Sequence, residues 1–267
     1  MSSTVTKALS LLEFFSEDEP ELGLSDLARR SGMDKAAVHR MLGSMAESGL
    51  VEQQADSRLY RLGAGVLRLA RVRETAFPVS AMMQPILLRL STETGETAHA
   101  SLISGRALAN IATCESKKGS RVSLVAGEVL PYHSTASGLA ALAYADDKLL
   151  DRVLSAPREA RTRFTLTERD DILTRIEVVR ANGFSESDQA HEEDVHGLAA
   201  PLFDRSGRAC GAVSVSTPSH RMTAEQRQLS IAAVLRAAED ITAGLGGQRP
   251  RGYADQVAGL LASGPRD

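Results

Sequence analysis

The sequence predicts an α+β protein of two domains, and three observations support this. The chain has 267 residues, about twice the usual size of one domain. Its apolar fraction of 43% and charged fraction of 24% are ordinary for folded globular proteins. Apolar residues first recur at helical spacing, and later segments alternate between strand-like and helical patterns. Hairpin-linked strands among helices favour a largely antiparallel sheet flanked by helices.

The first helical segments lie at the N-terminus. Apolar residues repeat at helical spacing from Val5 to Phe15, and Pro20 follows an acidic run that ends this helix. Ser25 is a candidate N-cap for a second, short helix over residues 26–31. These two helices precede the most informative segment of the domain.

A third helix and a hairpin complete the N-terminal domain. Asp34 is a candidate N-cap for this helix, and Gly49 stands at the C′ position that ends it. Residues 50–54 and 58–62 read as two short strands around a polar turn. Three helices followed by a hairpin are typical of a winged helix-turn-helix, which we assign to residues 1–62. The apolar stripe of the third helix consists of Val38, Met41, Leu42 and Met45.

A linker helix over residues 63–78 leads to a second domain over residues 79–245, with Pro78 at the boundary. A capping box at Thr223 and Gln226 opens its last helix. We expect the glycine-bearing segment 246–267 to be a flexible tail with at most one short helix over 254–262. The expected strands are 97–103, 107–114, 121–125, 198–203 and 209–216, and the expected helices are 80–95, 138–144, 148–154, 167–183 and 223–244.

The distribution of charge is more informative than its total. The net charge of −3 does not by itself indicate a nucleic-acid partner, and 4% aromatic residues disfavour binding of single strands by stacking. Residues 25–73, however, hold nine basic and five acidic side chains, a local charge of +4. Because a helix-turn-helix neutralises phosphates locally, this basic face favours double-stranded DNA as a partner.

Composition also indicates the compartment. Cys114 and Cys210 are too few for a disulfide-rich secreted scaffold, and we expect both to be buried small apolar residues. The first residues carry no apolar signal core, and no apolar run approaches the ~20 residues that span a bilayer. We therefore expect a cytoplasmic protein with no membrane partner.

Short motifs follow one another along the chain in a fixed order and spacing. They are TVTKAL at 4–9, LSDLA at 24–28, SGMDKAAVHRML at 31–42, ESGLV at 47–51, YRLG at 60–63, GETAH at 95–99, HSTASG at 133–138, AAPLFD at 199–204 and GAVSVS at 211–216. This ordered set, which covers about residues 4–245, resembles the IclR-type (isocitrate lyase regulator) bacterial transcriptional regulators.

The resemblance implies a function as well as a fold. It implies a winged-helix DNA reader, a linker helix and an effector-binding domain with a GAF-like, profilin-like fold. It further implies a homodimer that pairs into a homotetramer, a pseudo-palindromic operator, no cofactor and no metal. We expect a repressor of a catabolic operon that is not an enzyme and that senses a small organic effector, such as a carboxylate or an aromatic acid derivative.

The sequence departs from the family pattern at three places. Ala36-Ala37 stand where the family has Ser-Thr, whose hydroxyls cap the recognition helix or contact phosphate. Leu139 replaces a lysine, and Ala190, Asp194 and Gly197 replace the usual residues of the effector loop. We therefore expect an effector other than glyoxylate or pyruvate, and Gly197 leaves room for a larger one such as an aromatic ring.

The candidate DNA-binding residues lie on the third helix and the hairpin. Lys35, His39 and Arg40 are on the polar side of the helix, from which they can reach base edges or phosphates. The alternative is a solvated helix face. The full candidate set is Ser25, Lys35, Ala36, Ala37, His39, Arg40, Arg58 and Arg61.

The candidate effector residues are carried over from the family positions. The start of the helix near Ser137 offers backbone N–H groups and a helix dipole to a carboxylate, and the alternative is a plain N-cap by Ser137. Serines at 214 and 216 point to one side of their strand, and His99 is either a buried strand histidine or a ligand contact. The full candidate set is His99, Ala136, Ser137, Ser187, Asp188, Gly197, Ser214 and Ser216.

An enzymatic alternative is a hydrolase that uses His133, Ser137 and Asp188, or a metal enzyme. His191 and His196 are five residues apart, which places them about 140° apart around a helix and not on one face as a zinc-protease motif requires. No Gly-x-Ser-x-Gly nucleophile elbow is present in the sequence. The regulator interpretation is therefore favoured.

Overall fold

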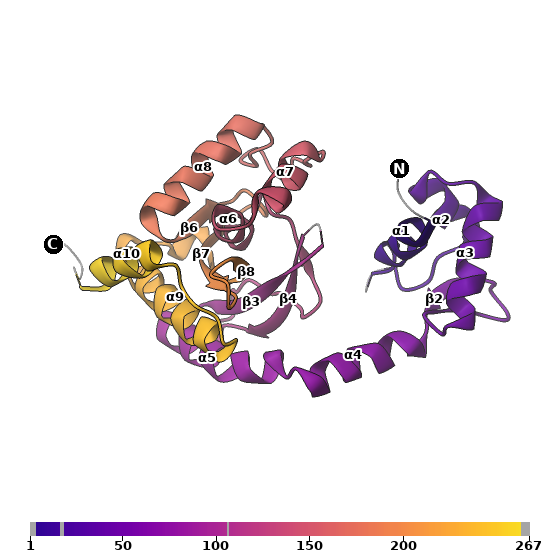
Figure 1. Cartoon of the computed structure of the whole chain (residues 1–267), viewed down its shortest axis with the longest axis horizontal. Helices are drawn as coiled ribbons and strands as arrows, with labels where there is room; N and C mark the ends of the chain where they lie inside the picture. The colour runs from indigo at the N-terminus through magenta and orange to yellow at the C-terminus, as the bar shows by residue number, and fades with distance from the viewer. Residues whose placement is uncertain (1–3, 17–18, 106, 263–267) are drawn as a thin grey trace. The chain divides into compact units, whose positions relative to one another are not determined.

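The computed structural model describes residues 4–16, 19–105 and 107–262, and the chain divides into two compact units, Met1–Pro78 and Val79–Asp267. In the N-terminal unit, the helices pack around Leu11, Leu27, Val38 and Leu42, and Tyr60 of the hairpin closes this core. The arrangement is the expected winged helix-turn-helix (Figure 1). Its elements are α1 (Thr4–Ser10), η1 (Leu11–Phe14), α2 (Leu24–Ser31), α3 (Lys35–Glu47), β1 (Val51–Gln53), β2 (Tyr60–Leu62) and α4 (Ala64–Ala76).

Of the two helix caps predicted for this unit, one is present in the structure and the other is not. The Asp34 carboxylate caps α3 by accepting hydrogen bonds from the backbone N–H groups of Ala36 and Ala37. The prediction that Ser25 caps the second helix is wrong. That helix begins at Leu24, and Gly23 occupies the N-cap without a side-chain hydrogen bond. The extended backbone at Gly23 starts the helix two residues earlier than expected.

The end of α3 is joined closely to the start of the linker helix α4. The N–H of Gly65 donates a hydrogen bond to the carbonyl of Gly49 at 2.8 Å. A Cβ at Gly65 would lie 2.5 Å from that oxygen, so only glycine permits this approach. The φ of Gly49 is +72°, which fits its predicted place after the helix.

The C-terminal unit is built on an antiparallel sheet with the strand order β5-β4-β3-β8-β7-β6. The central strands β3 and β8 pair in a register that sets His99 opposite Ser214. Because these two strands are buried between helices, their side chains are protected from solvent along most of their length. The strands are β3 (Thr97–Ser104), β4 (Ala107–Cys114), β5 (Val129–Leu130), β6 (Ser185–Asp188), β7 (Val195–Phe203) and β8 (Ala209–Pro218).

Helices cover both faces of this sheet (Figure 1). One face packs against α5 (Val79–Thr94) and α9 (Ala224–Gly244), whose apolar residues form the larger core. The other face packs against α6 (Ala136–Ala143), with α7 (Asp147–Ser155) and α8 (Arg169–Asn182) outside it. The expected fold class, an α+β domain over an antiparallel sheet, is thereby confirmed. Within the described residues, no helix is long and apolar enough to cross a membrane.

Two predicted elements of this unit differ in the structure. Residues 121–125 form a loop instead of a strand, because side chains hold their backbone carbonyls. Thr97 Oγ1 donates to the Val122 carbonyl at 2.6 Å, and Asn110 Nδ2 donates to the Val125 carbonyl at 2.8 Å. Helix α8 begins at Arg169 and not at Thr167, since Glu168 occupies the N-cap.

The segment 246–267, expected to be a flexible tail with at most one short helix over 254–262, contains helix α10 (Arg251–Ala262), which begins three residues earlier than that helix. Tyr253 and Val257 of this helix are 4% and 1% exposed and belong to the larger core. The ring of Tyr253 packs edge-on against Tyr144 and Phe203. Burial of these two side chains explains why a segment rich in glycine and proline is ordered. Residues 263–267 lie outside the described part of the chain.

Candidate functional site

Helix α3 presents one exposed face. Val38, Leu42 and Met45 are buried, whereas His39 and Arg40 point to solvent. Positions 36, 39, 40 and 43 follow the i, i+3, i+4, i+7 spacing of a single helix face, and all are exposed. The side chains of His39 and Arg40 make no hydrogen bond or ion pair with any described residue. This face is therefore available to a partner.

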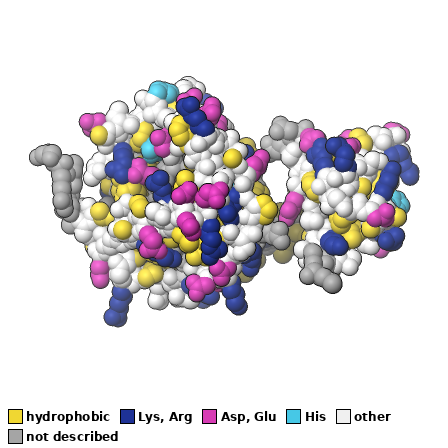
Figure 2. Space-filling view, turned by 90° about the horizontal axis from the view of Figure 1, so that it is seen from above, with side chains coloured by type: hydrophobic (Ala, Val, Ile, Leu, Met, Phe, Trp, Pro, Cys, Tyr) yellow, Lys and Arg dark blue, Asp and Glu magenta, His cyan; other side chains and the backbone are white. Residues whose placement is uncertain are grey.

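The arginines near this face are not equivalent. Arg61 pairs with Glu52 at 2.5 Å, with Glu21 3.8 Å away, so carboxylates already compensate its charge. Arg30 and Arg29 are also paired, with Glu19 and Asp26. Figure 2 shows Lys and Arg side chains at several places on the visible face of the N-terminal unit. The cations of the candidate DNA-binding set without an ion pair to a described residue are Lys35, Arg40 and Arg58.

Two of these cations have defined local geometry. Lys35 Nζ donates a hydrogen bond to Ser25 Oγ at 2.8 Å, which joins the first turn of α3 to α2. Arg58 lies in the turn between β1 and β2 with a φ of +60°, a conformation that is uncommon for a residue other than glycine. Gln53 Nε2 donates to the Arg58 carbonyl at 2.8 Å and fixes this turn. The Arg58 side chain is exposed at the tip of the wing.

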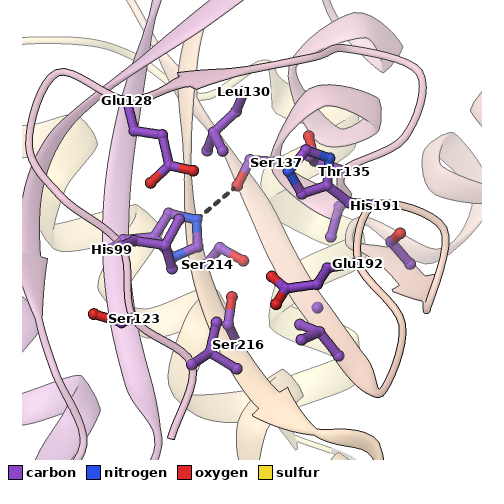
Figure 3. A pocket seen from close by; sticks show the side chains of 16 residues that line it. His99, Ser123, Glu128, Leu130, Thr135, Ser137, His191, Glu192, Ser214 and Ser216 are labelled. Atoms are coloured by element: carbon purple, nitrogen blue, oxygen red, sulfur yellow. Dashed lines mark hydrogen bonds between the residues drawn. The ribbon is translucent and has the colours of Figure 1, made fainter. Parts of the chain in front are cut away.

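The C-terminal unit contains a pocket beside the first turn of α6. Seven of the eight candidate effector residues line it, from strands β3, β6, β7 and β8 and from α6 (Figure 3). Asp188 is not among the lining residues, and its Oδ1 instead lies 3.5 Å from Nδ1 of His196. The candidate effector residues that line the pocket are His99, Ala136, Ser137, Ser187, Gly197, Ser214 and Ser216.

Local hydrogen bonds place the first turn of α6 against the pocket. Thr135, and not Ser137, is the N-cap: its Oγ1 accepts from the Gly138 N–H at 2.9 Å and donates to the Pro131 carbonyl at 2.7 Å. A Cβ at Gly138 would lie 2.3 Å from the Tyr132 carbonyl oxygen, so only glycine allows this turn to pack so closely. Ser137 is thereby free to direct its hydroxyl toward His99, 3.4 Å from Nε2.

His99 is a buried polar residue at the wall of the pocket. It is 3% exposed, and its Nδ1 has no hydrogen-bond partner among the described residues. Burial lowers the pKa of His99 to about 4, so the ring is uncharged at neutral pH. A neutral imidazole carries one donor and one acceptor nitrogen, and a ligand can therefore meet it in either role.

Other lining residues were not predicted from the sequence. His191 contacts Ser134 through Nδ1 and Oγ at 3.1 Å, and burial lowers its pKa to about 4. Glu128 and Glu192 also line the pocket and are labelled in Figure 3. These residues come from loops that only the folded chain brings together, so no local pattern in the sequence indicates them.

The residues of the enzymatic alternative have separate partners. His133 Nε2 contacts the Glu159 carbonyl at 2.9 Å, Ser137 faces His99, and Asp188 lies beside His196. The three side chains thus do not form a triad. In the described part of the chain, no group of three or more His, Cys, Asp or Glu side chains is arranged to hold a metal ion.

Comparison with known sequences covers both units. Residues 4–55 match the family described as "IclR helix-turn-helix domain", and residues 75–243 match "Bacterial transcriptional regulator IclR C-terminal". The HTH-type transcriptional regulator KdgR of Escherichia coli (strain K12) is 31% identical over 247 residues, 91% of this chain and 93% of that protein. The Pca regulon regulatory protein of Pseudomonas putida is 31% identical over 244 residues, 90% of this chain and 82% of that protein.

Solved structures agree with these matches. A putative IclR transcriptional regulator from Silicibacter sp. TM1040 superimposes with a TM-score of 0.86 at 41% identity, over 94% of this chain and 99% of that one. An IclR homologue from Microbacterium hydrocarbonoxydans, complexed with 4-hydroxybenzoate, shares the fold with a TM-score of 0.70 at 22% identity, over 91% and 99% of the two chains. Sequence, fold and the exposed α3 face thus agree, and the chain belongs to the IclR family of DNA-binding transcriptional regulators.

Proposed function

We propose that this protein is a ligand-responsive repressor of a catabolic operon. Its α3 helix enters the major groove of an operator and its wing contacts the flanking backbone. The observation that carries this proposal is the exposed face of α3, where His39 and Arg40 have no partner among the described residues. Its relatives KdgR and the Pca regulon regulatory protein are named as regulators, which supports the proposal that this protein regulates an operon. DNA as the partner supports a cytoplasmic location.

The N-terminal unit supports self-association. Leu69 and Val72 of α4 lie three residues apart on one helix face and are 48% and 60% exposed, and Phe77 directly after this helix is 64% exposed. Large apolar side chains exposed together favour burial against another surface. A second copy of the chain fits, because a twofold dimer presents two α3 helices to two half-sites. We therefore propose a homodimer on a pseudo-palindromic operator, and a dimer of dimers as the larger assembly.

The pocket supports a small organic effector. Its free volume is about 60 Å³. Since a water needs about 10–15 Å³, the pocket holds about four to six water-sized groups. From the sequence, the N–H groups and the dipole at the start of α6 predict a ligand with a carboxylate. In the folded unit, however, the carboxylates of Glu128 and Glu192 line the same pocket and disfavour an acid.

A gel-shift experiment tests the regulator. The probe is the DNA upstream of this gene and of the neighbouring operon, and a fragment from inside a coding sequence is the control. We expect affinity in the nanomolar class for the upstream DNA, with a steep decrease as salt rises because phosphates are neutralised. Equal affinity for both fragments at all salt concentrations would contradict operator binding.

A further inference from the structure

The pocket beside α6 is lined by two carboxylates and by no lysine or arginine among the described residues. Glu128 comes from the turn before β5, and Glu192 comes from the loop between β6 and β7. Figure 3 shows both carboxylate groups directed toward the interior of the pocket from different sides. Glu128 accepts one hydrogen bond, from the Val125 N–H at 3.3 Å, and the carboxylate of Glu192 accepts none from the described residues.

The histidines of the pocket do not offset these two negative charges. Burial holds the pKa of His99 and of His191 at about 4, so both rings are uncharged at neutral pH. Arg161 contributes to the lowered pKa of His191 after burial, but it is not a lining residue; like Glu192, it is exposed. The described lining therefore contains two acidic side chains and no cationic one.

The positive end of α6 is too weak to reverse this field. A helix N-terminus is equivalent to about half a positive charge, whereas two carboxylate groups line the same pocket. Thr135 already accepts the Gly138 N–H, which removes one donor from that end. A negatively charged ligand would thus be repelled, whereas a cation would be attracted.

The pocket also holds a buried polar atom without a partner. His99 is 3% exposed, and its Nδ1 makes no hydrogen bond to a described residue. Buried polar groups in proteins are almost always hydrogen-bonded, and an orphaned one marks a ligand or water position. Ser137, Ser214 and Ser216 add hydroxyls to the same wall, so the site suits a polar ligand.

From these observations we infer that the effector carries a cationic group, an ammonium or an amidinium, which Glu128 and Glu192 hold between them. Its polar remainder meets His99 and the serines. This inference rests on the proposed function, because it takes this pocket as the effector site. It departs from the acid effector expected from the sequence, because the folded unit brings in two carboxylates that the motif at 133–138 does not contain.

The test uses probes of equal shape and different charge. Acetate, acetamide and acetamidine form one planar series, and benzoate, benzamide and benzamidine form a larger one. Thermal unfolding of the full chain is followed with each probe at constant ionic strength, because a ligand that binds the native state raises the midpoint with concentration. We expect the amidines to raise the midpoint at concentrations at least tenfold lower than the amides, and the acids to have no effect.

Two variants and a matched control tie the effect to the carboxylates. Glu128→Gln and Glu192→Gln are each expected to weaken the amidine response at least tenfold, and the double variant to abolish the preference over the amide. Glu193→Gln is the control, since Glu193 is exposed like its neighbour Glu192 but does not line the pocket. The unfolding midpoint of each variant without probe verifies that it is folded.

The outcomes separate this inference from the proposed function. A response to the acids, an equal response to all three charge states, or no response to either amidine overturns the inference. Operator binding is measured in parallel, without probe, on the same preparations. If the chain binds upstream DNA but not the amidines, the cationic effector is wrong and the regulator stands. If it binds the amidines through both glutamates but does not bind DNA, the pocket is a cation-binding site and the proposed function fails.

Discussion

His99 and Ser137 meet at the wall of the pocket, with Nε2 of the imidazole 3.4 Å from Oγ of the serine. The contact joins strand β3 to the first turn of α6, and both residues are at least 97% buried. Only one of the two ring nitrogens has a partner among the described residues. A ligand in the pocket can therefore bond the second ring nitrogen, Nδ1, and the charge of the ring changes with pH.

The first prediction concerns acid stability. The folded pKa of His99 is about 4, below its ordinary value of about 6.5. Between these two values the unfolded chain binds a proton that the folded chain does not, so stability falls as pH falls from about 6.5 toward about 4. From pH 7 to pH 5 this costs about 2 kcal/mol, measured as a decrease in the unfolding free energy of the C-terminal unit. His191 adds to the same trend.

Substitution of His99 isolates its contribution. His99→Gln is expected to remove a large part of the decrease in stability between pH 7 and pH 5. His220→Gln is the matched control, because His220 is exposed on the same unit. If both variants keep the pH dependence of the parent chain, burial of His99 is not its cause.

The second prediction concerns the exposed face of α3. Arg40→Ala is expected to weaken operator binding about 10- to 100-fold, because an arginine contact to a base or phosphate contributes about 1–3 kcal/mol. A gel shift at several salt concentrations measures the loss and shows whether the salt dependence decreases. Arg175→Ala is the control, since Arg175 is exposed on α8 in the other unit. Unchanged affinity in Arg40→Ala would remove this residue from the docking face.

The sequence predicted those elements that local patterns specify. The cap of α3 at Asp34 was correct because the carboxylate acts two and three residues along the chain. The cap of α9 at Thr223 was correct for the same reason, with Gln226 N–H as the donor. The segment 121–125 was wrong because its partners, Thr97 and Asn110, are distant in sequence and act through side chains.

The pocket was predictable only in part for a similar physical reason. Residues on regular elements, such as Ser214 and Ser216 on β8, follow the alternation of a strand and were placed correctly on one side. Glu128 and Glu192 lie in loops, where no periodicity tells which way a side chain points. Their carboxylates are the basis of the proposed cationic effector, and only the folded unit brings them to the pocket.

The third prediction concerns a buried carboxylate at the start of β3. Glu96 is 1% exposed, accepts two hydrogen bonds from Arg221 at 2.9 and 2.7 Å, and accepts one from Lys118 at 2.8 Å. These cations hold the pKa of Glu96 below its ordinary value despite the burial. Glu96→Gln leaves both cations without their carboxylate and is expected to cost about 2 kcal/mol.

Thermal unfolding measures this cost. For a unit of this size, the loss corresponds to a decrease of about 4–8 °C in the midpoint. Glu115→Gln is the control, because Glu115 pairs with Arg121 at the exposed surface and such pairs contribute about 0–1 kcal/mol. Equal midpoints for the two variants would show that burial of Glu96 adds nothing to the strength of its ion pairs.

The last prediction concerns helix α10, the segment for which the sequence suggested a flexible tail. The Tyr253 ring lies 5.2 Å from that of Tyr144 and 4.9 Å from that of Phe203, centroid to centroid, yet its buried hydroxyl has no partner among the described residues. Tyr253→Ala is expected to cost about 3–5 kcal/mol through the cavity it leaves. Tyr253→Phe keeps the ring, removes the unpaired hydroxyl, and is expected to be neutral or stabilising. Thermal unfolding together with hydrogen exchange over residues 251–262 measures both, and an equal loss in the two variants would show that the hydroxyl, and not the ring, holds α10 in place.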